Sequence, residues 1–269
     1  MKDKRVLYVS SEVIPYLPET EISSMSFEAP RAVNSKDGQI RIFMPRYGNI
    51  NERRHQLHEV IRLSGMNLVI NDLDMPLIIK VASIPKERMQ VYFIENDDYF
   101  KRKATYADED GVFYPDNDER AIFFAKGVIE TVKKLNWSPD IIHVHGWLAS
   151  FLPLYLKKYY GNEPLFENSK IVTSIYNQGF SGTLDKEVNV KLMYDGIEEE
   201  DIVELKDPTY VNLMKIAIKN SDAIIIGSSE IPSQLETFLK EIDKPVLKFH
   251  NKEEFQEAYI DFYNTKVLK

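Results

Sequence analysis

The chain has 269 residues, 43% of them hydrophobic, and a formal net charge of −8, which together indicate a globular protein with a full core. The acidic balance argues against a nucleic-acid partner. No apolar run approaches the length of a membrane span. The absence of cysteine excludes disulfides and thiolate metal sites. We expect a cytoplasmic protein, because the charged start Met1–Arg5 leads into an apolar run too short for the core of a signal peptide. We also expect no metal and no cofactor.

The first predicted element is a buried strand at Arg5–Val9, an apolar run rich in β-formers that ends at two serines. A loop with two prolines follows, and Ile22–Val33 is predicted to be a helix. Ligands of doubly wound α/β domains lie just past the carboxyl ends of the strands, so this first loop is the natural place for a phosphate. A phosphate site usually needs glycine and often a lysine, and the segment from Ser10 to Met25 contains neither.

A second strand is predicted at Gln39–Met44, and between residues 57 and 95 the pattern changes to short β-prone runs separated by turn signals. No helix long enough for a crossover separates these runs. They are therefore predicted to pair antiparallel, as a meander at one edge of a parallel sheet. The runs are Leu57–Leu63, Met66–Ile70, Leu77–Ile84 and Gln90–Glu95.

The segment Asn96–Asp118 combines aromatic and acidic side chains, and it includes Tyr114, Asp116 and Asn117. Aromatic faces stack on sugar rings while carboxylates and amides bond their hydroxyls, so this composition suits a carbohydrate ligand. A surface loop that packs its own aromatic side chains explains the same composition equally well. Both interpretations stay open at this point.

A long helix is predicted to begin at Asp116, where Glu119 completes a capping box, and the buried strand Ile141–His145 follows it. His143 and His145 are two residues apart on this strand and therefore share a face. No nearby acid or histidine supplies a third ligand, so the pair does not indicate a metal site.

The last predicted strands are Lys170–Ile175 and Ala223–Ile226, with a helix between residues 207 and 220 that begins at Asp207 and Pro208. Further helices are predicted at residues 232–242 and from residue 251. The pattern as a whole predicts one α/β domain over residues 1–269. Its Rossmann-like, mostly parallel sheet carries the antiparallel β meander as an insertion, and helices occupy the C-terminal residues 230–264.

Several motifs resemble the amino-terminal half of bacterial glycogen synthases and plant starch synthases, glycosyltransferase family 5. Ser11–Pro15 reads like the opening of that family, a Ser-Glu, two apolar residues and a proline. Tyr114–Asn117 is similar to the family's Tyr-Thr-Asp-Asn, His143–Trp147 to its His-x-His-Asp-Trp, and Tyr176-Asn177 to its His-Asn. The resemblance covers residues 4–229 and implies the amino-terminal domain of the GT-B architecture. The family's carboxy-terminal half, which holds most of the nucleotide, has no counterpart in this sequence.

The resemblance implies a glucosyl donor site whose family residues are replaced in this chain. Pro18 stands where the family has a lysine, and Thr20 and Glu21 stand where it has the paired glycines that serve the ADP-glucose diphosphate. Gly146 and Tyr176 replace a family aspartate and histidine. A carboxylate at a diphosphate site repels the donor. We therefore expect no catalytic residue and no glucose transfer by this chain alone.

The expected ligand site lies at the carboxyl ends of the strands, where aromatic faces, amides and carboxylates suit a neutral sugar. One possible function is a catalytically degenerate glucan-binding or regulatory relative in α-glucan metabolism. The alternative is a glucosyltransferase subunit that needs a separate GT-B carboxy-terminal half as its partner. An α-glucan or oligosaccharide is the expected ligand. The candidate substrate-binding residues are Thr20, Glu21, Tyr114, Asp116, Asn117, His145, Trp147, Tyr176 and Asn177.

Overall fold

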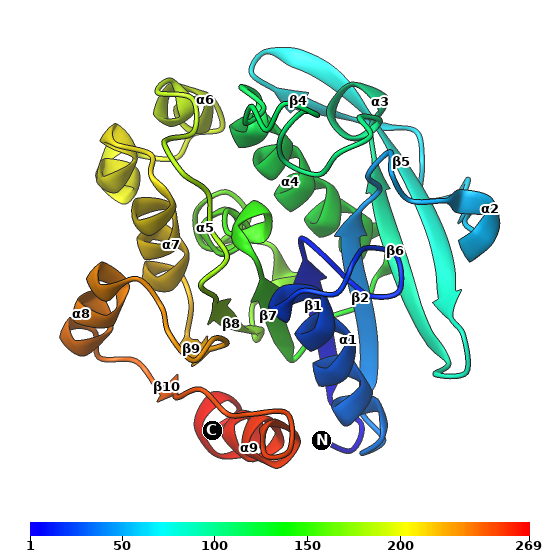
Figure 1. The fold of residues 1–269 in the computed structure, drawn as a ribbon, viewed down its shortest axis with the longest axis vertical. Coiled ribbons are helices and arrows are strands. Elements are labelled where there is room, and N and C mark those ends of the chain that lie inside the picture. The colour runs from blue at the N-terminus through cyan, green and yellow to red at the C-terminus, as the bar shows by residue number, and fades with distance from the viewer.

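The computed structural model, which describes residues 1–269, is organised around one ten-stranded sheet with the order β10-β9-β8-β7-β1-β2-β6-β5-β3, in which β4 also pairs with β5 (Figure 1). All strands from β10 to β6 in this order are parallel, and β5 is antiparallel to β6, β4 and β3. The strands are β1 Arg5–Ser10, β2 Gln39–Pro45, β3 His58–Glu59, β4 Met66–Ile70, β5 Leu73–Ile84, β6 Met89–Glu95, β7 Ile141–His145, β8 Lys170–Ile175, β9 Ala223–Ile226 and β10 Val246–Leu247.

The predicted α/β class with a mostly parallel sheet is confirmed, and the antiparallel strands lie at one edge as expected. Two details of the meander differ from the prediction. β6 belongs to the parallel part of the sheet, where it pairs with β2. Only His58–Glu59 of the run predicted at Leu57–Leu63 is a strand, because the chain turns immediately afterwards and the N–H of Leu63 donates to the carbonyl of Val60 at 2.8 Å.

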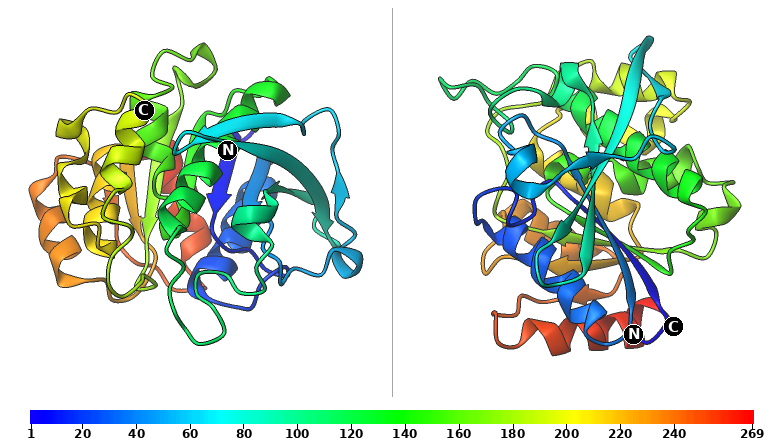
Figure 2. Two further views of the ribbon diagram at one scale, coloured as in Figure 1. Left: turned by 90° about the horizontal axis from the view of Figure 1, so that it is seen from above. Right: turned by 90° about the vertical axis from the view of Figure 1, so that its right-hand side faces the viewer.

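Helices cover both faces of the sheet, which explains why its central strands read as unbroken apolar runs. α1 connects β1 to β2 and lies on one face beside α9, while α4, α5 and α7 cover the other face (Figures 1 and 2). Right-handed crossovers require this division, because the chain moves in one direction from β1 to β2 and in the opposite direction from β7 to β9. The helices are α1 Glu21–Asn34, α2 Glu52–His55, α3 Asp97–Phe100, α4 Asn117–Leu135, α5 Leu152–Lys158, α6 Val188–Tyr194, α7 Tyr210–Lys219, α8 Ser233–Glu241 and α9 Phe255–Phe262, with short 3₁₀ turns at Trp147–Ala149, Pro164–Phe166 and Glu199–Lys206 and a π-helical turn at Tyr263–Val267.

One continuous cluster of buried apolar side chains joins the sheet to both helix layers. Val6, Leu7 and Val9 of β1 are at most 2% exposed, and Phe255 and Phe262 of α9 belong to the same cluster. The C-terminal helix is therefore part of the core. None of the helices combines the length and the apolar composition that crossing a membrane requires.

Of three predicted helix starts, the one at Asp116 is confirmed in position without its capping box, and the other two are wrong. Asp116 precedes α4 but makes no capping hydrogen bond, because its carboxylate pairs with Arg102 instead. α7 is capped by Thr209, two residues after the predicted start at Asp207. α9 begins at Phe255 rather than at residue 251.

Candidate functional site

The start of α1 lies at the carboxyl end of β1 and is capped by its own residues. Thr20 Oγ1 accepts a hydrogen bond from the backbone N–H of Ser23 at 3.0 Å, and Ser23 Oγ accepts one from the N–H of Thr20 at 2.8 Å. This reciprocal cap satisfies backbone donors that otherwise face a ligand at a helix start. The N–H of Ser23, one of the donors with which α1 could hold a phosphate, is therefore already used by the side chain of Thr20.

Glu12, just beyond β1, connects three loops that are far apart in the sequence. Its residue is 5% exposed, and its carboxylate accepts hydrogen bonds from the hydroxyls of Thr20 at 2.7 Å and Tyr106 at 2.9 Å and from the Gln178 amide at 3.1 and 3.2 Å. All three donors are neutral. A buried carboxylate held only by neutral donors is a strong acceptor for a further hydroxyl. We call these four side chains the Glu12 cluster.

The sequence pattern identified Thr20 in this cluster but missed the other three members. Glu12 was visible only as part of the family motif, although it is the single charged residue between Ser10 and Leu17, directly after a buried strand. That isolated acid was the available signal. Gln178 and Tyr106 carried no local signal, because they lie 166 and 94 residues from Glu12 in the chain.

Glu21 and Asn177 are brought together by Ser228, which the sequence pattern also missed. Ser228 Oγ donates to Glu21 Oε2 at 2.5 Å and accepts from the backbone N–H of Asn177 at 2.9 Å. This links the start of α1 to the loops after β8 and β9. Two of the candidate residues thus lie at one place on the carboxyl edge of the sheet, next to the Glu12 cluster.

His145 and Tyr176 lie beneath this edge, sealed in the protein. His145 Nδ1 is 2.7 Å from the Tyr176 hydroxyl, and these residues are 0% and 1% exposed. His143 is held between the hydroxyls of Tyr263 at 2.6 Å and Ser174 at 2.7 Å. Burial lowers the pKa of His145 to about 3 and holds the pKa of His143 well below its ordinary value, so both rings are neutral at pH 7.

Trp147 is the centre of an aromatic stack and is 2% exposed. Its ring centroid lies 4.9 Å from that of Tyr106, 5.0 Å from Phe180 and 5.6 Å from Phe113. The expectation that the side chains of His145, Trp147 and Tyr176 line an open concavity is therefore wrong for this structure, because other side chains cover all three. That they contact a ligand stays a prediction.

Gly146 stands between the two buried motif residues of β7 and Trp147, with a φ of 82° that disfavours any side chain. A Cβ placed there lies 1.9 Å from the hydroxyl oxygen of Ser11. The aspartate that the family carries at this position does not fit unless Ser11 moves. Glycine is therefore required by the local backbone and by the close approach of the first loop.

The predicted rim residues hold their own loop together. Asp116 accepts from Arg102 at 2.6 Å, and the Tyr114 ring lies between the guanidinium groups of Arg102 at 4.5 Å and Arg120 at 5.2 Å. Asn117 is 1% exposed and accepts from Arg120 at 2.5 Å. These contacts are those of a loop that packs its own aromatic side chains, the second of the two interpretations that the composition left open.

Arg120 was not recognised in the sequence, and it anchors this loop from α4. It is fully buried, its Nε donates to the carbonyl of Tyr99 at 2.7 Å, and no carboxylate bonds to it directly. Burial lowers its pKa. Through Asn117, which also donates to the carbonyl of Tyr106 at 2.8 Å, the guanidinium fixes the position of the Glu12 cluster.

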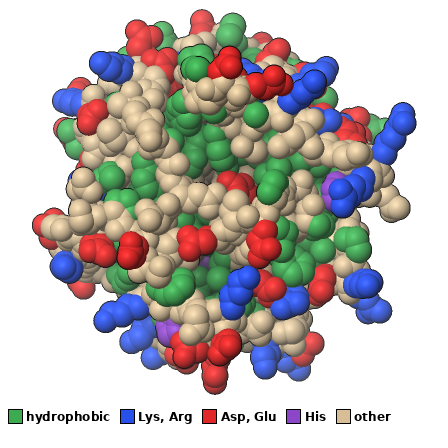
Figure 3. All heavy atoms as spheres, viewed as in Figure 1, with side chains coloured by type: hydrophobic (Ala, Val, Ile, Leu, Met, Phe, Trp, Pro, Cys, Tyr) green, Lys and Arg blue, Asp and Glu red, His purple; other side chains and the backbone are tan.

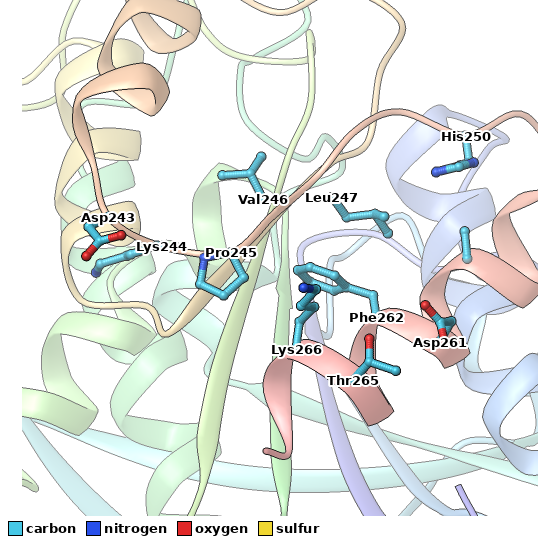
Figure 4. Close-up of a pocket in the computed structure, with 11 residues that line it drawn as sticks. Asp243, Lys244, Pro245, Val246, Leu247, His250, Asp261, Phe262, Thr265 and Lys266 are labelled. Atoms are coloured by element: carbon cyan, nitrogen blue, oxygen red, sulfur yellow. The ribbon is translucent and has the colours of Figure 1, made fainter.

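Three cavities border the C-terminal tail, which we define as residues 245–269. One of about 550 Å³ lies between α8 and residues 246–249 and contains no candidate residue. Two more border α9. One of about 270 Å³ lies beside Thr20 and Glu21, with Gly227 and tail residues as its other walls. The other, about 760 Å³, lies between β10 and α9 and contains no candidate residue (Figure 4). In Figure 4 Leu247 of β10 and Phe262 and Lys266 of the C-terminal helices lie on opposite sides of this cavity. Only the smallest of the three cavities touches the predicted site.

The surface has charges of both signs. Figure 3 shows acidic side chains both across the middle of one face and at its rim, and basic side chains mostly near the rim with no continuous basic area. Acidic residues outnumber lysine and arginine 42 to 34 in the chain. A polyanionic ligand finds no complementary field on this face.

Comparisons with known proteins give a consistent result. The sequence profile of the starch synthase catalytic domain matches residues 5–244. A glycogen synthase of Chlorobium limicola is 35% identical over 243 residues, covering 83% of this chain and 49% of the relative. A glycogen synthase of Chlorobium luteolum is 36% identical over 228 residues, covering 84% and 46%.

Among solved structures, the catalytic domain of starch synthase IV from Arabidopsis thaliana, bound to ADP and acarbose, has the same fold. It superposes with a TM-score of 0.75 at 17% identity, over 93% of this chain and 52% of that one. The chain thus spans about half the length of the relatives it matches.

Proposed function

Because this chain belongs to the starch synthase catalytic domain family, we propose that it is a glucan-binding relative that does not transfer glucose by itself. The ligand binds at the carboxyl ends of the strands, next to the Glu12 cluster. A regulatory role in α-glucan metabolism is the function that such binding serves.

The observation that carries this proposal is the chemistry at the start of α1. Thr20 caps the helix there, and the Glu21 carboxylate is held beside it by Ser228. A negative charge about 4 Å from another repels it by about 4 kcal/mol at an effective dielectric constant of about 20. A diphosphate placed at this helix start meets that repulsion together with the buried Glu12 carboxylate nearby. A neutral sugar meets neither penalty and can donate its hydroxyls to both acids.

Calorimetric titration tests the proposal directly. We expect the purified chain to bind maltooligosaccharides and to show no heat with ADP-glucose. Radiolabelled ADP-glucose incubated with the protein and glycogen should leave no label in the polymer above the level without protein. Label above that level, or the absence of binding to any glucan, removes this function.

A second function is supported by the length of the chain, which covers only 49% of the glycogen synthase of Chlorobium limicola. Under this alternative the chain is one half of an ADP-glucose-dependent transferase, and a separate polypeptide supplies the nucleotide-binding half. A neighbouring reading frame that encodes such a half, and glucose transfer when the two products are mixed, would establish it. The self-capped start of α1 favours the first function.

A further inference from the structure

The cavity of about 270 Å³ beside α1 is built by two parts of the chain with different origins. Ser24 and Met25 of α1 form one wall, and Phe249, His250 and Phe255 of the C-terminal tail form the other. The family profile ends at residue 244, so the tail wall lies outside the matched segment. Within this cavity the family resemblance assigns a ligand only to the positions of Thr20 and Glu21, where the family's glycines serve the donor diphosphate. It assigns none to the tail wall.

The walls combine an aromatic surface with hydrogen-bonding groups of both kinds. Phe249 is 40% exposed, which is unusual for so large an apolar side chain, while Phe255 is 2% exposed and closes the cavity from below. Glu21 uses Oε2 to accept from Ser228, which leaves Oε1 free as an acceptor. The Ser24 hydroxyl donates to Glu19 at 3.2 Å and keeps its oxygen as an acceptor, and His250 adds a ring nitrogen. An apolar face beside such acceptors and donors suits a sugar ring.

Charge and size narrow the class of ligand. The acidic side chains that line the cavity are Glu19, Glu21 and Glu28, and Lys252 is its one lysine, which pairs with Glu19 at 3.4 Å. This excess of negative charge disfavours phosphates and nucleotides. The volume of about 270 Å³ lies just below the roughly 300–1,000 Å³ typical of sites for drug-sized ligands, so it accommodates one ring rather than several.

We propose that this cavity binds a single neutral sugar ring, with Phe249 as the stacking surface and Glu21 as the hydroxyl acceptor. The inference rests on the glucan-binding function proposed above and locates it. We take this ring to be the end of an α-glucan chain, because the volume of about 270 Å³ suits one ring.

Titration of the wild type and three variants with maltotriose tests the inference. We expect Phe249→Ala to raise the dissociation constant about tenfold, the effect of losing one aromatic stacking contact. Glu21→Gln keeps the bond from Ser228 but loses the charge, and it should raise the constant by roughly fivefold to tenfold. Tyr194→Ala is the matched control, an aromatic side chain on α6 that is 69% exposed and far from the cavity in the fold. Because Phe249 is also exposed, we expect all three variants to fold with melting temperatures close to that of the wild type.

Each outcome separates this inference from the function on which it rests. One outcome is that the dissociation constants of both cavity variants lie within about twofold of the wild-type value, a change near measurement error. In that case the protein binds glucan but the cavity is not the site. If β-cyclodextrin, which has no chain end, binds as tightly as maltotriose, recognition of a chain end is wrong. Tighter binding of ADP-glucose than of maltotriose overturns the inference that the ligand is a neutral sugar. Failure of the wild type to bind any glucan overturns the proposed function itself.

Discussion

Two groups of polar side chains lie close together on the carboxyl half of the sheet, and they differ in what covers them. The Glu12 cluster is assembled from loops at the edge of the protein. The other group, which we call the histidine cluster, consists of His143, His145, Tyr176 and Tyr263 and is sealed under α9 and the turn that follows it. Polar groups sealed from water stabilise the fold where they satisfy one another, as both ring nitrogens of His143 do, although Nε2 of His145 has no partner. Groups at an edge can exchange partners with a ligand. A motif position therefore does not by itself place a residue in the ligand site.

The largest effect is expected for Trp147→Ala, because Trp147 lies at the boundary between the two groups. Its burial within the aromatic stack predicts a loss of about 3–5 kcal/mol in the free energy of unfolding, the usual cost of truncating a buried tryptophan. Urea denaturation measures this loss. If Trp147 instead belongs to the ligand site, glucan affinity of the folded protein falls while stability changes little. That result would show that Trp147, like the Glu12 cluster, belongs to the ligand site.

The histidine cluster predicts that the protein loses stability in mild acid. Because the folded pKa of both histidines lies below the unfolded value of about 6.5, unfolding takes up protons below that pH, and each ring costs about 1.4 kcal/mol of stability per pH unit there. The loss continues as pH falls toward the folded pKa of about 3 of His145. Burial raises the pKa of Asp118 to about 6, which acts in the opposite direction because the folded state then binds the extra proton. We expect a net loss of about 2 kcal/mol between pH 7 and pH 5.5.

Urea midpoints at the two pH values measure this loss. His145→Asn keeps an acceptor near the position of Nδ1 but does not titrate, so the part of the pH dependence that comes from histidine should fall by about half. A stability that is the same at pH 7 and pH 5.5 would show that the rings are not sealed.

Glu12→Gln tests the Glu12 cluster, the group at the edge of the protein. The substitution keeps the shape of the side chain but removes the charge and turns an amide N–H toward donors, so we expect a loss of about 1–2 kcal/mol in stability. Glucan affinity should weaken as well, and a calorimetric titration measures that change. Glu199→Gln, an exposed carboxylate on the surface, is the control. Unchanged affinity with reduced stability would assign a purely structural role to Glu12.

The smallest effect is expected for Asp116→Asn. Its ion pair with Arg102 is partly exposed, with side-chain exposures of 23% and 32%, so its loss should cost about 0.5–1 kcal/mol. The loop keeps its contact through Arg120, and thermal denaturation should show a shift of a few degrees at most. A large shift would mean that the rim loop depends on this pair rather than on the buried guanidinium.

The sequence by itself determined the sheet and the family. Unbroken apolar runs such as Val6–Val9 predicted the central strands, and Met66–Ile70 was predicted with the bounds that the structure shows. The replacement of family residues by Thr20 and Glu21 was also visible in the sequence. Each of these features can be recognised from residues that are adjacent in the sequence. A strand buried on both faces is an unbroken apolar run, and the chemistry of one loop depends on its own few residues.

Only the tertiary structure decided which side chains reach a ligand. Gln178 meets Glu12 across 166 residues, Ser228 meets Glu21 across 207, and Tyr263 meets His143 across 120. No local pattern encodes such pairs, because crossover topology and the return of the tail bring them together. The tail changes the site most. Because α9 covers one face of the sheet, His143 and His145 are buried in the core. The segment before α9 completes a cavity beside Glu21. A motif fixes where a residue lies along a strand, and the packing of distant segments fixes whether solvent or a ligand can touch it.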